Sequence, residues 1–268
     1  MIGVFDSGYG GLTVFRELDK KFPEHDFIYF GDNARAPYGS RSPETIYQYT
    51  KECVDWLFRE GCELIILVCN TASATALRKI QQEYLPANFP QKRVLGVLIP
   101  IAEAIARENN SEKIGILATK ATVESGAYLR EIQKYVEPRR FDIVQKTAPL
   151  LVPLIEEGMS DHPVTRAILA EYLADFKKDN IKNIILGCTH YSFIKHLIAA
   201  EIPEATIFDS PTVIPASLEN YLSRHPEIES KLSKSDTRRF ITTDDPSAFA
   251  KFAKNNLGLS ISAEKIYL

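Results

Sequence analysis

The sequence has 268 residues, of which 45% are hydrophobic and 25% are charged, and its formal net charge at pH 7 is −3. This length and apolar content are enough for one large core or two smaller ones. The slightly acidic balance gives no electrostatic reason to expect nucleic acid or an anionic membrane as the main partner, and it leaves small, charged metabolites open as ligands.

The chain begins MIGVFDSGYGG, without the basic segment and the long apolar run of a signal peptide. It contains no run of 18 or more apolar residues that would predict a transmembrane helix. Four cysteines are too few for a disulfide scaffold, and none lies in a Cys-x-x-Cys pair. We therefore expect a cytoplasmic protein with reduced thiols.

Short apolar runs alternate with longer amphipathic stretches along the chain, which is the pattern of strands connected by helices. Each run is rich in the β-branched and aromatic residues that strands favour. The predicted strands are Ile2–Phe5, Phe27–Phe30, Leu64–Val68, Val94–Leu98, Lys113–Leu117, Asp142–Gln145, Asn183–Leu186, Thr206–Phe208 and Arg239–Thr242.

The clearest predicted helix begins at the segment SPET. Ser42 is expected to be its N-cap, Pro43 occupies the first helical position, and Gly61 ends the pattern. The apolar positions that share one stripe of this helix are Ile46, Cys53 and Leu57. Strands and helices in this alternation predict an α/β fold with mostly parallel sheets flanked by helices.

Two segments of the chain echo one another. IILVCNTAS at 65–73 and IILGCTHYS at 184–192 both lead from Ile-Ile-Leu to a cysteine, and both end on a serine. The echo suggests two similar lobes, each with its own sheet. We expect residues 1–95 and 210–268 to form the first lobe and residues 96–209 the second, with the active site between them.

Ligands of parallel α/β sheets gather beyond the carboxyl ends of the strands. In this sequence polar and reactive residues follow several of the predicted strands. These residues are Asp6, Ser7, Asp32, Cys69, Asn70, Thr71, Thr119, Cys188, Thr189 and His190. Together they form the candidate site.

The four cysteines fall into two pairs. Cys53 and Cys62 lie on and just beyond an apolar helix face and are expected to be packing residues. Cys69 and Cys188 each stand where a helix is expected to begin, and free backbone N–H groups there favour a thiolate over a thiol. The residues expected to cap these two helix starts are Asn70 or Thr71, and Thr189.

These motifs allow three other interpretations, and the sequence gives an argument against each. The glycines of DSGYGG form either a tight turn or a loop whose N–H groups bind phosphate or carboxylate, but their spacing fits neither the dinucleotide nor the Walker motif. A covalent hydrolase built on Cys188 and His190 would leave Cys69 unused. A metal site of Cys188, His190 and His196 matches no zinc spacing.

Two thiols on opposite sides of a substrate suit one type of reaction. Inversion of a carbon that bears an acidic hydrogen needs one group to remove the proton from one face and another to return a proton to the opposite face. A thiol can do either near neutral pH, because its ordinary pKa is about 8.5.

The motifs FDSGYGGLTV, YFGDNARAPYG, CNTASA and GCTHY, in this order and spacing, resemble those of the glutamate racemases, which are cofactor-independent members of the aspartate/glutamate racemase superfamily. VPLIEEG and FITTDDPSAFAKFA are similar to further segments of that family. The resemblance implies two pseudo-symmetric α/β lobes, and the interconversion of L- and D-glutamate for peptidoglycan synthesis. It also implies a cytoplasmic homodimer without a cofactor.

The resemblance assigns roles to individual residues. The two acid/base groups correspond to Cys69 and Cys188. The polar residues that match those supporting the cysteines are Asp6, Asp32, Glu156 and His190. The residues that match substrate contacts are Asp6, Ser7, Tyr38, Gly39, Asn70, Thr71, Thr119, Thr189 and His190.

This sequence departs from the family pattern at two positions. Ser192 replaces a proline after GCTHY, and Ile99 replaces a glutamate that many members carry before Pro100. Neither change removes a predicted catalytic group. One alternative function is racemisation of aspartate or another acidic amino acid. A second, from another class, is a phosphate or acidic-metabolite binding module whose cysteines are structural.

Overall fold

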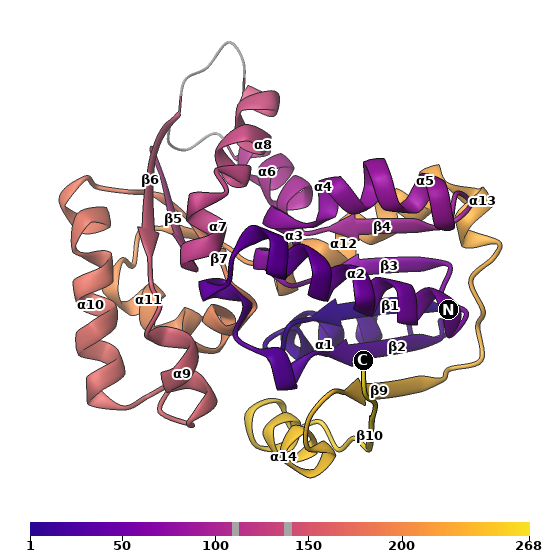
Figure 1. Ribbon diagram of the computed structural model, residues 1–268. Helices are drawn as coiled ribbons and strands as arrows, with labels where there is room; N and C mark the ends of the chain where they lie inside the picture. The colour runs from indigo at the N-terminus through magenta and orange to yellow at the C-terminus, as the bar shows by residue number, and fades with distance from the viewer. Residues whose placement is uncertain (109–112, 137–140) are drawn as a thin grey trace.

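The computed structural model describes residues 1–108, 113–136 and 141–268. Two sheets form its centre, and every strand pair in them is parallel (Figure 1). The first sheet has the order β10 (Ala263–Lys265), β9 (Arg238–Thr242), β2 (Phe27–Gly31), β1 (Ile2–Asp6), β3 (Leu64–Leu67) and β4 (Arg93–Gly96). The second has the order β6 (Asp142–Thr147), β5 (Lys113–Ala118), β7 (Asn183–Gly187) and β8 (Thr206–Phe208). The prediction of an α/β fold with parallel sheets is confirmed.

Helices connect the strands and flank both sheets. Those that begin before β5 are α1 (Leu12–Lys21), η1 (Asn33–Arg35), η2 (Tyr38–Ser40), α2 (Pro43–Arg59), α3 (Asn70–Thr75), α4 (Leu77–Lys79), the π-helix η3 (Ile80–Tyr84), α5 (Leu85–Asn88) and α6 (Leu98–Arg107). The later ones are α7 (Lys120–Glu124), α8 (Ala127–Val136), α9 (Leu151–Glu156), α10 (Pro163–Lys178), η4 (Thr189–Ile194), α11 (Lys195–Glu201), α12 (Ser210–Arg224), α13 (Pro226–Glu229) and α14 (Pro246–Leu257).

Successive side chains along the strands of the first sheet point to opposite faces, and each face packs into a different apolar core. Val4 packs on one face in a cluster with α1 and α12, whereas Phe5 packs on the other face in a cluster with α2. The first cluster continues through α6 and α8 to Ile116 of the second sheet, so that one apolar core reaches both sheets. The far face of the second sheet packs against α10.

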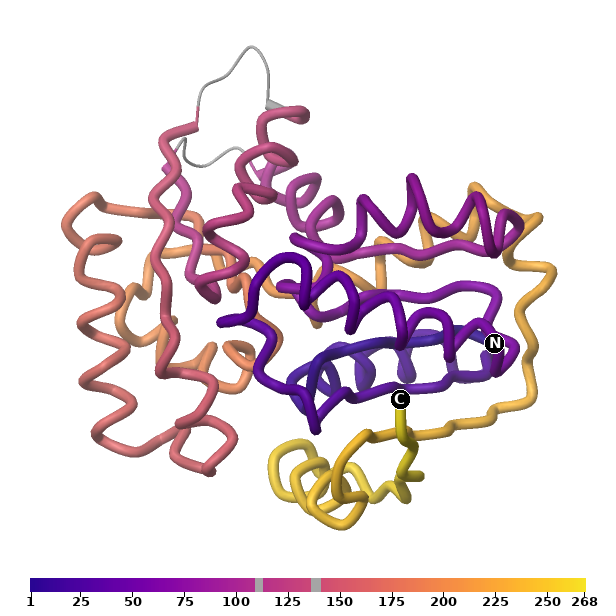
Figure 2. Tube along the Cα trace, in the orientation of Figure 1, coloured from indigo at the N-terminus to yellow at the C-terminus, as the bar shows by residue number. Residues whose placement is uncertain are grey.

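The chain path places parts of both chain ends in one sheet. After β8 the chain returns as α12 and ends in β9 and β10, which extend the first sheet beside β2 (Figure 2). The first sheet therefore contains β1–β4, β9 and β10, and the second contains β5–β8. The lobe boundaries at 95/96 and 209/210 stay a prediction.

The strand at β4 differs from the prediction of Val94–Leu98. It ends at Gly96, and Leu98 is the first residue of α6. The predicted end of the strand is wrong because α6 also begins with apolar residues. The hydrophobicity of the sequence therefore does not change where the strand ends and the helix begins. The strand β10 was not predicted, since its sequence Ala-Glu-Lys is short and largely exposed. In the described part of the chain, no helix combines the length and the apolar character needed to cross a bilayer.

The start and end of α2 are as predicted. Ser42 Oγ accepts a hydrogen bond from Thr45 N at 3.3 Å, and Pro43 is the first helical residue. Ile46, Cys53 and Leu57 are buried. Beyond the helix Gly61 has φ +91°, a backbone conformation that favours glycine.

We expect Ser42→Ala to lower the free energy of unfolding by about 1 kcal/mol, because it removes the N-cap acceptor of α2. Urea denaturation of the purified protein measures this change. Ser42→Asp is the matched control, since it keeps an acceptor and should retain most of the stability. An equal loss in both variants would show that the cap does not stabilise α2.

Candidate active site

The carboxyl ends of strands from both sheets border one cavity of about 210 Å³. Ser7 follows β1, Cys69 lies beyond β3, Thr119 follows β5 and Cys188 follows β7. The predicted site residues that line this cavity are Ser7, Tyr38, Gly39, Cys69, Asn70, Thr71, Thr119, Glu156, Cys188, Thr189 and His190. Asp6 and Asp32 are fully buried and do not line the cavity themselves. Each contacts a residue that does, Thr189 for Asp6 and Tyr38 for Asp32.

Cys69 is a buried thiol at the start of α3. Its Sγ lies 3.4 Å from Ser7 Oγ and accepts from Ala72 N at 3.5 Å, so that Cys69 is itself the N-cap. Burial first, and then the charge of Asp6, raises the pKa of the Cys69 thiol to about 12. The expectation that the helix start favours a thiolate here is wrong, because α3 has only six residues and desolvation outweighs its N–H groups.

Cys188 stands in a different environment. It has extended backbone geometry and is the N-cap residue of η4, so the helix start expected here is present as a 3₁₀-helix, although the Cys188 side chain makes no cap hydrogen bond. Its Sγ lies 4.0 Å from His190 Nδ1. The other ring nitrogen of His190, Nε2, lies 2.9 Å from Glu156 Oε1. The sulfur of Cys188, the imidazole of His190 and the carboxylate of Glu156 are therefore linked in one series of contacts.

The contacts with Cys188 and Glu156 determine the charge of His190. Burial alone would lower the pKa of the imidazole, but the hydrogen bonds with Cys188 and Glu156 raise it to about 10. His190 is therefore an imidazolium at neutral pH, and its Nδ1 faces the sulfur of Cys188. The two cysteines therefore differ in their surroundings, because a positively charged His190 lies beside Cys188, whereas the negative charge of Asp6 acts on Cys69.

Asp6 connects the loop after β1 to η4. Its Oδ2 accepts from Gly8 N at 3.1 Å, and its Oδ1 accepts from Thr189 Oγ1 at 3.3 Å. Burial raises the pKa of Asp6, although His190 acts in the opposite direction. Asp6 thus holds together strand ends from the two sheets.

The glycine-rich segment DSGYGG allows that close contact. A Cβ placed on Gly10 would lie 2.4 Å from Thr189 Oγ1 and 2.6 Å from His190 Nδ1. No larger residue fits there without displacing η4. One of the N–H groups expected to be open, that of Gly8, already donates to Asp6. Close packing therefore explains this glycine.

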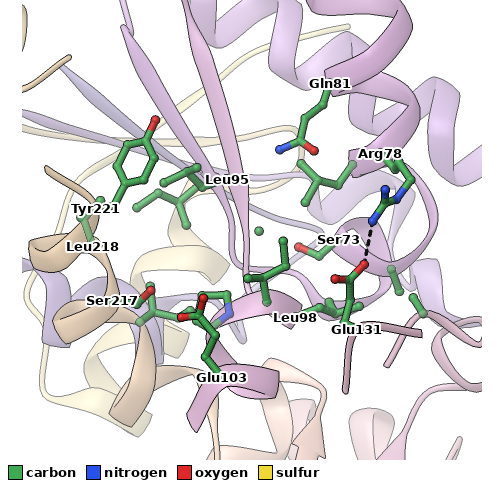
Figure 3. Close-up of a pocket in the computed structure, with 18 of the residues that line it drawn as sticks. Ser73, Arg78, Gln81, Leu95, Leu98, Glu103, Glu131, Ser217, Leu218 and Tyr221 are labelled. Carbon is green, nitrogen blue, oxygen red and sulfur yellow. Dashed lines mark hydrogen bonds and ion pairs between the residues drawn. The ribbon is translucent and has the colours of Figure 1, made fainter. Parts of the chain in front are cut away.

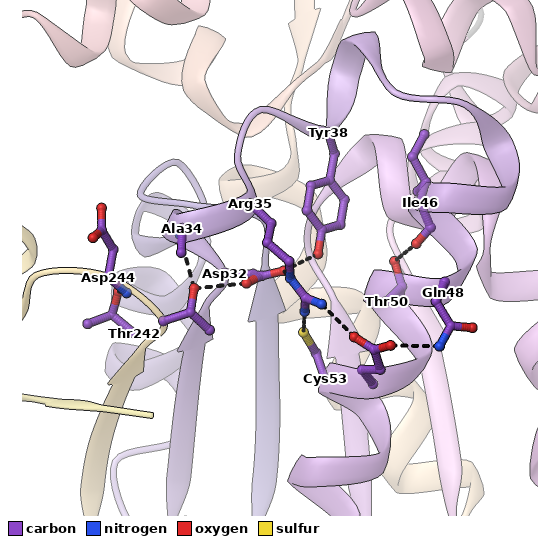
Figure 4. Close-up of polar contacts among 12 residues, drawn as sticks. Asp32, Ala34, Arg35, Tyr38, Ile46, Gln48, Thr50, Cys53, Thr242 and Asp244 are labelled. Atoms are coloured by element: carbon purple, nitrogen blue, oxygen red, sulfur yellow. Dashed lines mark hydrogen bonds and ion pairs between the residues drawn. The ribbon is translucent and has the colours of Figure 1, made fainter. Parts of the chain in front are cut away.

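Asp32 lies in a separate network beside the cavity (Figure 4). Its Oδ2 accepts from Arg35 Nε at 2.7 Å and from the Tyr38 hydroxyl, and its Oδ1 accepts from Thr243 Oγ1 at 2.8 Å. Arg35 Nη2 also donates to the buried Cys53 at 3.3 Å. Asp32 therefore orients Tyr38, which lines the cavity, and within the described residues no hydrogen bond joins Asp32 to either cavity cysteine.

The residues expected to cap the helix starts contact other groups. Thr71 Oγ1 and Thr119 Oγ1 are 2.9 Å apart, and Thr122 Oγ1 lies within hydrogen-bond distance of both. Thr189 Oγ1 donates to Asp6. The capping roles expected for Asn70 or Thr71, and for Thr189, are therefore wrong, because Cys69 itself caps α3 and no side chain caps η4.

Two supporting residues were not identified from the sequence. Thr122 closes the threonine cluster, and its spacing of three from Thr119 is the one sequence signal that would have found it. The hydroxyl of Tyr128 donates to Asn70 Oδ1 at 2.6 Å. It comes from the first turn of α8, and nothing in the local sequence distinguishes it from a packing tyrosine.

The metal site considered for Cys188, His190 and His196 is not assembled. His196 is exposed and lies 2.8 Å from Asp161 Oδ1. Among the residues that the structure describes, no group of three or more His, Cys, Asp or Glu side chains is arranged to hold a metal ion.

A second cavity, of about 590 Å³, lies among α4, α6, α8 and α12 (Figure 3). It is larger than the first, but neither cavity cysteine lines it. Arg78 Nη2 and Glu131 Oε1 form an ion pair at 2.7 Å within it. Ile99, at one of the departures from the family pattern, is 42% exposed and borders it. The smaller cavity is therefore the candidate active site.

Comparison with known proteins gives a consistent result. Residues 2–216 match the model of the Asp/Glu/hydantoin racemase family. A glutamate racemase of Persephonella marina is 39% identical over 100% of this chain and 97% of its own length. The structure of glutamate racemase isoform RacE1 from Bacillus anthracis matches with TM-score 0.91 and 30% identity, covering 100% of this chain and 97% of that one. A glutamate racemase from Francisella tularensis, solved in complex with D-glutamate, has TM-score 0.87 and 34% identity, with 99% and 97% covered.

The pKa of His190 predicts how stability depends on pH. The pKa is about 10 in the folded chain, above its ordinary 6.5, so the stabilisation is complete below pH 6.5 and is lost as the pH rises through 10. Glu156→Gln removes the charged acceptor and should lower the free energy of unfolding by about 2 kcal/mol below pH 6.5. The difference from wild type should shrink towards pH 10.

Urea denaturation across this pH range measures the difference. Glu157→Gln is the control, because Glu157 is the exposed neighbour in the sequence, whereas His190 Nε2 pairs with Glu156. A loss in Glu156→Gln that stays constant from pH 6.5 to pH 10 would contradict the assigned pairing.

Proposed function

We propose that this chain, which belongs to the Asp/Glu/hydantoin racemase family, is an amino-acid racemase that interconverts L- and D-glutamate without a cofactor. The observation that carries the mechanism is the pair of cysteines in one cavity. One is a thiol whose pKa is raised by burial, and the other stands beside an imidazolium. We infer that Cys69 acts as the acid and Cys188 as the base when L-glutamate is bound.

The reaction follows from this asymmetry. The thiolate of Cys188 removes the α-proton of L-glutamate and becomes a thiol, while the electron pair of the C–H bond stays on the α-carbon. The thiol of Cys69 then gives its proton to the opposite face and becomes a thiolate, which yields D-glutamate. In the reverse reaction Cys69 is the base and Cys188 is the acid.

Neighbouring groups assist each cysteine in this mechanism. His190, charged and paired with Glu156, stabilises the thiolate of Cys188. Asp6 has the opposite effect on Cys69, since its negative charge favours the thiol. We propose that Asp6 and His190 act chiefly by tuning and orienting the sulfur atoms.

The polar lining suits an acidic amino acid. The hydroxyls of Ser7, Thr71 and Thr119 and the side-chain amide of Asn70 are donors that can hydrogen-bond carboxylate oxygens. Asp32 lies behind the lining and fixes the position of Tyr38. We propose that these donors hold the two carboxylates while the α-carbon lies between the cysteines.

The biological setting is also proposed from the family. D-glutamate made by this chain would supply peptidoglycan synthesis in the cytoplasm, and the active protein would be a homodimer. Sedimentation equilibrium should give twice the mass of one chain, which is 30.2 kDa. A single species with the mass of one chain would contradict the homodimer.

Replacing each cysteine with serine tests the two-base mechanism. Circular dichroism should show that the wild-type protein abolishes the optical activity of L-glutamate and of D-glutamate, and both variants should lose at least about 100-fold in turnover. In deuterated water, residual exchange of the α-hydrogen should favour D-glutamate in Cys188→Ser and L-glutamate in Cys69→Ser, because in each variant only the remaining thiol acts as the base.

Cys62→Ser is the control, since Cys62 is buried outside the cavity. This substitution should lower stability, but it should not make α-hydrogen exchange favour one enantiomer. Two results would overturn the mechanism: equal exchange of both enantiomers in both cavity variants, or wild-type turnover in either. Faster turnover of aspartate than of glutamate by the wild-type protein would overturn the proposed substrate alone.

A further inference from the structure

Tyr128 touches both of the strand ends that carry the cavity cysteines. Its side chain is 1% exposed, and its hydroxyl donates to Asn70, the residue after Cys69. Its ring lies against Gly187, the residue before Cys188, since a Cβ there would be 3.4 Å from Tyr128 Cε2. Tyr128 is outside the cavity lining, so it can act on a ligand only through its neighbours.

The hydrogen bond fixes the orientation of the Asn70 amide. Oδ1 accepts from Tyr128 at 2.6 Å, so the N–H donors of Nδ2 point to the other side of the amide group. Within residues 1–108, 113–136 and 141–268, Nδ2 is buried and has no hydrogen-bond partner. A buried donor without an acceptor is costly, and Asn70 borders the cavity, where an oxygen atom of a ligand can remove that cost.

We propose that Tyr128 is a positioning residue, which holds the Asn70 amide so that Nδ2 donates to a carboxylate oxygen of the substrate. This inference rests on the proposed function, because it assigns a role within the same site. The hydroxyl of Tyr128 makes no contact with the reacting carbon. Its effect therefore belongs to substrate binding, in the ground state and the transition state equally.

Tyr128→Phe removes the hydroxyl and keeps the ring against Gly187. The freed amide no longer has one fixed orientation, so KM for glutamate should rise roughly five- to tenfold, whereas kcat should stay within about twofold. The dissociation constant should rise by the same factor. Calorimetry with equimolar D- and L-glutamate measures it, because no net racemisation occurs in that mixture.

Two further variants separate positioning from packing. Tyr135→Phe is the matched control, since Tyr135 lies on the same helix, is 42% exposed and should leave KM and kcat unchanged. In an Asn70→Ala background, Tyr128→Phe should cause no further rise in KM, because the group that it positions is gone.

A rise in KM that is as large in the Asn70→Ala background as in wild type would overturn the inference. So would a fall in kcat with KM unchanged, since that pattern indicates a disturbed cysteine. If the wild-type protein instead binds equimolar D- and L-aspartate and Tyr128→Phe weakens that binding, the positioning role stands and the proposed substrate fails. If wild type binds neither amino acid, both proposals fail.

Discussion

The hydrogen bond between Thr189 and Asp6 joins the end of β1 to the segment that follows β7, and the candidate site depends on that junction. The two sheets have separate hydrogen-bond ladders, so side chains and close packing must align their carboxyl ends. Gly10 allows this because it leaves room for η4 against the first loop. Asp6 then fixes the approach with both carboxylate oxygens, because a buried carboxyl group that moved away from Gly8 N and Thr189 Oγ1 would lose both of these hydrogen bonds.

Burial and charge give two similar segments different chemistry. Both cysteines follow a strand that contains two consecutive isoleucines, and both are nearly inaccessible to solvent. Only Cys188 has a histidine two residues later, and that histidine is held by Glu156 from α9. Similar strand ends thus place two sulfur atoms at one cavity, while their charged neighbours differ: His190 lies beside Cys188, whereas burial and Asp6 raise the pKa of Cys69.

Much of the fold and of the site could be predicted because both depend on local patterns. Apolar runs indicated the strands, and the rule that ligands gather at strand ends selected Cys69 and Cys188. The end of β4 was misplaced because the helix that follows it is equally apolar. The high pKa of Cys69 arises from burial by distant residues, and Tyr128 reaches Asn70 from 58 residues away in the sequence. Such contacts leave no signal at the positions that make them.

The apolar core that runs from the first sheet through α6, α8 and α12 to the second has a consequence for the gene. Although the strands belong to two sheets, the side chains between them belong to one cluster. A gene divided between codons 95 and 96 would produce fragments that each expose part of this cluster to water. The two halves would therefore depend on each other for solubility, and recombination between relatives would preserve function only where both sides of this shared core come from compatible parents.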